Sequence, residues 1–150
     1  QQVAHDMVRT GCDVAVVAVG QWSASFKLDK HPYLVGVFRQ KMIDALDNLV
    51  TVFEQAAKPI AIYFHSLDYN PLGFHRSACP PFDWRDPVTL TAYDNALQAI
   101  CTERPRQCTF IDTRAIQKPV WDAAPDFNHP SATVVQPVAL MVAATVLGLW

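Results

Sequence analysis

The chain of 150 residues has little charge and lacks several features that mark common classes of protein. Its 12 lysines and arginines are scattered and its formal net charge is −2, so we expect no nucleic-acid partner. No C-x-x-C pair occurs, which argues against a zinc site built from cysteines, and no glycine-rich phosphate loop follows any apolar run. We therefore expect no metal and no cofactor. The content of 51% hydrophobic residues predicts a single globular domain over residues 1–150.

An apolar run long enough to cross a membrane is also missing. The segment from Val134 to Trp150 is strongly apolar, but it contains Gln136 and Pro137 and is shorter than the roughly 18–20 residues that a span requires. It predicts a helix that covers a sheet. The chain begins at Gln1 with neither an initiator Met nor a signal peptide, so we expect a processed chain or a segment of a longer one.

Alternating apolar runs and amphipathic stretches predict an α/β fold. Continuous apolar runs, typical of strands covered on both faces, predict strands at residues 13–19, 60–64 and 109–112. Helical spacing of apolar residues predicts helices at residues 3–10, 33–57, 89–102 and 131–150. This order predicts right-handed crossovers and a three-layer α/β/α, flavodoxin-like parallel sheet. A sheet of three strands is small, so we expect one or two further strands upstream of Gln1.

Polar residues follow each predicted strand. Gly20 and Gln21 follow the first strand, His65 and Ser66 follow the second, and Asp112 and Thr113 lie at the end of the third. Ligands of parallel sheets bind outside the carboxyl ends of the strands, so these residues mark the expected site.

A carboxylate and a histidine stand close together before the last predicted helix, in Asp126-Phe127-Asn128-His129-Pro130. Such a carboxylate can hold the imidazole in one tautomer and stabilise its protonated form, as in a Ser-His-Asp triad. The alternative is that Asp126 caps the helix and His129 is an ordinary half-buried residue.

Taken together, three stretches resemble the C-terminal two thirds of an SGNH (GDSL-type) hydrolase. They are Asp13 to Trp22, Phe64-His65-Ser66 with the later His75 and Cys79, and Asp126 to His129. The nearest group is the PC-esterase and trichome-birefringence-like carbohydrate O-acetyl esterases and acetyltransferases. The resemblance implies that His129 is the general base and Asp126 its orienting acid. It also implies an oxyanion hole at the Gly20 backbone N–H and near the Gln21 side chain, where many relatives carry Asn or His.

The nucleophile of that family is absent from this sequence. Its Gly-Asp-Ser block follows an earlier strand, and none of the serines lies in that setting; they are Ser23, Ser25, Ser66, Ser77 and Ser131. Either the nucleophilic serine lies outside this chain, or the domain has lost its chemistry. The second possibility predicts an inactive domain that binds glycans or takes part in an assembly with other protein chains.

Several side chains are candidates for contact with a glycan or an acylated carbohydrate. They are Trp22, His65, Ser66 and His75, to which the loop 66–88 adds the aromatic residues Tyr69, Phe74, Phe82 and Trp84. Aromatic faces can stack on sugars, but these rings can equally plug the sheet edge or a subunit contact. The spacing of the two histidines matches no usual metal site.

The four cysteines are Cys12, Cys79, Cys101 and Cys108. The last two flank a short turn between a predicted helix and strand, which suits a disulfide; the alternative is buried thiols. A disulfide predicts a secreted, cell-surface or secretory-pathway protein.

Overall fold

The structure is a computed structural model that describes residues 2–24, 33–66, 87–117 and 132–149. Its helices and strands, in chain order, are α1 (Gln2–Thr10), β1 (Val14–Val17), the 3₁₀ turn η1 (Trp22–Ala24), α2 (Val35–Gln55), β2 (Ala61–His65), α4 (Pro87–Glu103), β3 (Thr109–Ile111), α5 (Arg114–Gln117) and α6 (Ala132–Val146). The predicted α/β class is confirmed.

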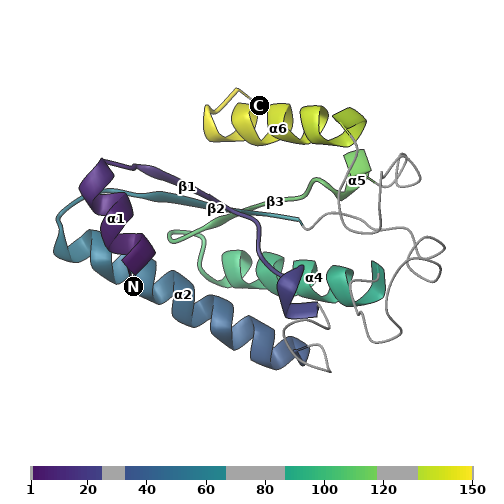
Figure 1. Ribbon diagram of the computed structural model, residues 1–150, viewed down its shortest axis with the longest axis horizontal. Helices are drawn as coiled ribbons and strands as arrows, with labels where there is room; N and C mark the ends of the chain where they lie inside the picture. Colours follow the sequence, from purple (N-terminus) through teal and green to yellow (C-terminus); the bar gives the residue numbers. More distant parts are fainter. Residues whose placement is uncertain (1, 25–32, 67–86, 118–131, 150) are drawn as a thin grey trace.

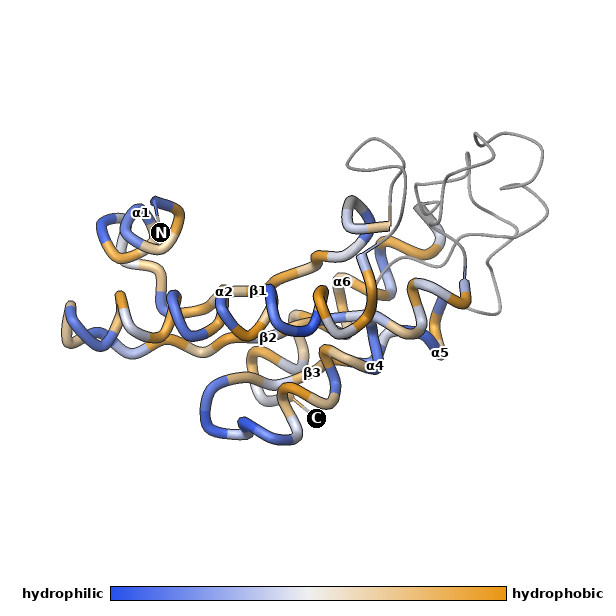
Figure 2. Tube along the Cα trace, turned by 90° about the horizontal axis from the view of Figure 1, so that it is seen from below, coloured by the Kyte–Doolittle hydropathy of each residue, from blue (hydrophilic) through white to orange (hydrophobic). Residues whose placement is uncertain are grey.

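The three described strands form one parallel sheet in the order β1-β2-β3 (Figure 1). Val16 pairs with Tyr63, and Tyr63 pairs in turn with Thr109. Helices α2 and α4 lie side by side on one face of the sheet, whereas α6 lies on the other side (Figure 1). Hydrophobic residues dominate the strands, and the turn between α4 and β3 is hydrophilic (Figure 2). Each strand is thus joined to the next by a helix, as the alternating sequence pattern predicts.

The core lies between the sheet and the pair α2 and α4. Phe38 of α2 and Tyr93 of α4 are fully buried and stack with ring centroids 4.1 Å apart. Ile62 and Phe64, alternate residues of β2, face the same core, as the period of two in a strand requires. An ion pair between Arg39 and Glu103 joins α2 to α4 at the surface, and a second one joins Asp47 of α2 to Arg104, the residue that follows α4.

The predicted coverage of the first strand on both faces is wrong in part. Ala15 of β1 is buried in the core, but the neighbouring Val16 points to the other face and is 44% exposed. Described elements therefore cover only one face of this strand fully. The strand is also shorter than the apolar run from Asp13 to Val19 that predicts it.

The helix ends follow local rules. Gly11 has a φ of 75° and ends α1 where the sequence places the stop, with Cys12 N–H bonded to the Met7 carbonyl. Helix α2 ends in the same way at Ala57, although this residue is not glycine and its φ is 52°. Among the described helices, none combines the length and the hydropathy needed to span a membrane.

Candidate functional site at the carboxyl edge of the sheet

The carboxyl ends of the three strands lie at one edge of the sheet because all pairings are parallel. Gly20 and Gln21 leave from β1, His65 ends β2, and Asp112 follows β3. The candidate site residues, which come from separate parts of the sequence, therefore lie at the same edge of the sheet.

Gly20 is buried and has a φ of 138°, a region that residues with a side chain rarely adopt. Its carbonyl accepts a hydrogen bond from the Ala24 N–H, which closes the turn into η1. A glycine is therefore needed here for the backbone conformation, and its missing side chain also permits a close approach to another molecule.

The turn after β1 is fixed by contacts with distant residues. The Ser23 carbonyl accepts a hydrogen bond from the Tyr33 N–H, and the Tyr93 hydroxyl donates to the Tyr33 carbonyl at 2.7 Å. The side-chain oxygen of Gln21 is buried in this turn. Burial raises the pKa of Tyr93 to about 12, so the hydroxyl keeps its proton and donates at neutral pH. The segment that carries Gly20 is thus held against α4.

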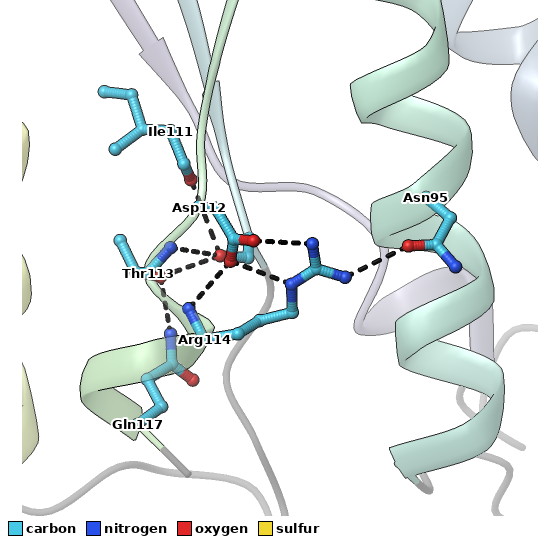
Figure 3. A network of polar contacts seen from close by, with 7 residues as sticks. Asn95, Ile111, Asp112, Thr113, Arg114 and Gln117 are labelled. Atoms are coloured by element: carbon cyan, nitrogen blue, oxygen red, sulfur yellow. Dashed lines mark hydrogen bonds and ion pairs between the residues drawn. The ribbon is translucent and has the colours of Figure 1, made fainter.

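A buried polar network joins the ends of β2 and β3 (Figure 3). The Ser66 hydroxyl oxygen accepts a hydrogen bond from the Thr113 N–H at 2.7 Å and lies 2.9 Å from the Thr113 hydroxyl oxygen. Gln117 of α5 donates from Nε2 to the same Thr113 oxygen at 2.8 Å. All three side chains are nearly inaccessible to solvent. Ser66 therefore positions the strand ends, and its contact with a substrate stays a prediction.

His65 ends β2 and is half-buried. Its Nδ1 lies 2.8 Å from the Ser66 carbonyl oxygen, so the neutral ring in this position carries its proton on Nδ1 and presents Nε2 as an acceptor. The ring is oriented by the backbone, which is compatible with binding a hydroxyl group.

The end of β3 carries a bidentate ion pair. Arg114 donates from Nε and from a terminal nitrogen to the two oxygens of Asp112, at 2.8 and 2.6 Å, and reaches Asn95 of α4 at 3.0 Å (Figure 3). Hydrogen bonding to Asp112 raises the pKa of Arg114, and the charge of the nearby Asp94 adds to this effect. The charge pair fixes the turn into α5 because Asp112 also accepts from the Arg114 N–H.

The disulfide predicted between Cys101 and Cys108 is confirmed. It joins the last turn of α4 to the start of β3 across a Cα–Cα distance of 5.1 Å, and both cysteines are buried. Cys12 is free and half-buried.

The other predicted site residues lie outside the described residues. They are Asp126, His129, His75, Cys79, the loop residues Tyr69, Phe74, Phe82 and Trp84, and the side chain of Trp22. Within the part of the chain that is described, no three side chains of the types that bind metals come together.

Gln117 and Tyr93 are among the residues that hold the edge and that the sequence interpretation missed. Gln117 belongs to a four-residue helix too short to show a periodic pattern, and Tyr93 sits within an apolar helical stripe. A tyrosine within an apolar stripe can indicate such a role, because its buried hydroxyl requires a hydrogen-bond partner.

Comparisons with protein-family models, curated proteins and solved structures found no match.

Proposed function

We propose that this chain is part of a three-layer, flavodoxin-like SGNH-type domain that acts on acyl esters of carbohydrates. The observation that carries the proposal is the convergence of Gly20, His65 and the Ser66–Thr113 network at one edge of a parallel sheet. A buried glycine with a φ of 138° is suited to bringing a backbone N–H close to a reacting oxygen.

The proposed reaction uses a serine supplied from outside this chain. Its hydroxyl attacks the acetyl carbonyl of the ester while His129 takes the proton and Asp126 stabilises the resulting imidazolium. The Gly20 N–H, helped by the Gln21 amide, stabilises the negative charge on the carbonyl oxygen. When the ester bond breaks, His129 returns the proton to the departing sugar oxygen.

The acyl group then passes from serine to water or to another sugar hydroxyl, with His129 acting again as the base. Hydrolysis and transfer differ only in this acceptor. Trp22, His65 and His75 are proposed to contact the carbohydrate. The disulfide of Cys101 and Cys108 supports a secreted or lumenal location, where such glycans are found.

A second candidate is an inactive domain that binds glycans or takes part in a protein assembly. The absence of a Gly-Asp-Ser block from the sequence and the aromatic residues of the loop 66–88 favour it. Binding of an acetylated oligosaccharide without release of acetate by the full-length protein would support this candidate over the enzyme.

Turnover of p-nitrophenyl acetate by the full-length protein and its His129→Ala variant tests the proposal. Loss of the general base is expected to lower kcat by about 10³-fold or more, as in other Ser-His-Asp enzymes. His5→Ala is the matched control, because His5 is exposed on α1 and should leave the rate unchanged. Equal rates for the wild type and the His129→Ala variant would remove His129 from the mechanism.

A further inference from the structure

The outer edge of β1 is an apolar surface that the described elements leave open. A groove of about 660 Å³ runs along it, lined by Val3, Ala4 and Met7 of α1, by the stretch 14–19 and by Leu49 of α2. No lining residue that the structure describes is charged. The groove therefore suits an apolar occupant.

Backbone groups of β1 face this groove. The Asp13 carbonyl accepts a hydrogen bond from the Ala61 N–H, which directs the N–H groups of Ala15 and Val17 toward β2. Because only alternate residues of a strand bond to a given neighbour, the N–H and C=O groups of Val14 and Val16 point away from β2. Among the described elements, no strand pairs with them. An extended polypeptide is the occupant whose chemistry matches such an edge.

The handedness of the crossovers predicts what fills the groove. Helices α2 and α4 lie in one layer and carry the chain from β1 to β2 and from β2 to β3, always in the same direction across the sheet. Helix α1 contacts α2 and precedes β1 directly. A right-handed crossover through α1 in that layer must start from a strand on the side of β1 that faces away from β2.

We infer that the groove receives a further parallel β-strand contributed by the same polypeptide on the N-terminal side of α1. Its backbone pairs with Val14 and Val16, and apolar side chains on one of its faces pack on α1 and α2. A second copy of the chain fits less well, because a twofold pairing of two β1 edges would be antiparallel. The inference rests on the fold and holds whether or not the domain is an enzyme.

Amide hydrogen exchange of the chain 1–150 and of the same polypeptide extended on its N-terminal side tests this inference. In the chain 1–150, the amides of Val14 and Val16 should exchange at least ~100-fold faster than those of Ala15 and Val17, which bond to β2. In the extended polypeptide all four amides should be slow. Fast exchange of Val14 and Val16 in the extended polypeptide would overturn the inference. So would protection of these amides in the chain 1–150 that depends on protein concentration, because it would assign the edge to a second copy.

A pair of matched variants gives a second readout. Val16 and Val37 are both 44% exposed, but only Val16 lies on the open strand. In the chain 1–150, Val16→Glu and Val37→Glu should have similarly small effects on Tm. In the extended polypeptide, Val16→Glu should lower Tm by roughly 5 °C more than Val37→Glu, because it would place a charge against the docked strand. Equal shifts in both polypeptides would contradict the inference.

Discussion

The hydroxyl oxygens of Ser66 and Thr113 lie 2.9 Å apart and tie the carboxyl end of β2 to that of β3. Both side chains are fully buried, and the Thr113 N–H has the Ser66 oxygen as its acceptor. The pair is thus a structural connection at the edge where the proposed site is assembled.

Removal of the Ser66 hydroxyl should destabilise the fold. Ser66→Ala leaves the buried Thr113 N–H and hydroxyl without this partner, which is expected to cost about 1–3 kcal/mol in the free energy of unfolding. Thr102→Ala is the control, since Thr102 is exposed on α4 and should change stability by less than about 0.5 kcal/mol. Urea denaturation measures both. In a double-mutant cycle, Ser66→Ala and Thr113→Val should be non-additive, and additive effects would show that the two hydroxyls act separately.

The end of α2 offers a stabilising substitution. Ala57 has a φ of 52°, a conformation that glycine adopts without the steric cost borne by a side chain. Ala57→Gly is therefore expected to raise the free energy of unfolding by about 0.5–1 kcal/mol. The adjacent Ala56 has a φ of −83°, so Ala56→Gly should lower stability instead. A loss of stability in both variants would contradict this account of the helix end.

Reduction of the Cys101–Cys108 disulfide should destabilise the protein modestly. The bridge closes a short loop with a sequence separation of 7, for which chain entropy predicts a contribution of about 2 kcal/mol. Thermal unfolding with and without a reductant measures it, and Cys12→Ser should leave the difference unchanged. An identical Tm in both conditions would show that the bridge contributes nothing to stability.

The buried hydroxyl of Tyr93 should make the fold sensitive to alkaline pH. Its pKa is raised in the folded state from 10.0 to about 12, so the folded protein retains a proton that the unfolded chain releases. The resulting stabilisation is complete below pH 10 and is lost as the pH rises from 10 to about 12. Tyr93→Phe should remove this part of the pH dependence and cost about 1 kcal/mol at neutral pH through the lost hydrogen bond. Tyr63→Phe is the control, and an unchanged alkaline profile in Tyr93→Phe would contradict the assignment.

The sequence predicted the larger elements because their patterns are strong. The stripe that includes Phe38, Leu46 and Phe53 recurs with helical spacing and forms the buried face of α2. Gly11 was a reliable stop because only glycine takes its conformation readily. The disulfide was predicted because Cys101 and Cys108 flank a short turn between a predicted helix and a predicted strand.

Other features depend on contacts between distant residues, which a local pattern does not contain. The exposure of Val16 reflects what lies beside β1, whereas an apolar run by itself predicts coverage on both faces. The role of Ser66 depends on Thr113, which is 47 positions away in sequence. The early end of β3 depends on Asp112, whose carboxylate accepts the Arg114 N–H and starts α5. Asp126 and His129 lie outside the described residues, so their part in the site stays a prediction.

Labelling of the full-length protein with a fluorophosphonate tests the central claim most directly, because the reagent reacts with a serine activated by a neighbouring base. We predict one labelled serine, outside the 150 residues of this chain, and loss of the label in the His129→Ala variant but not in His5→Ala. No labelling, or a label that persists in His129→Ala, would contradict the acyl-transfer mechanism.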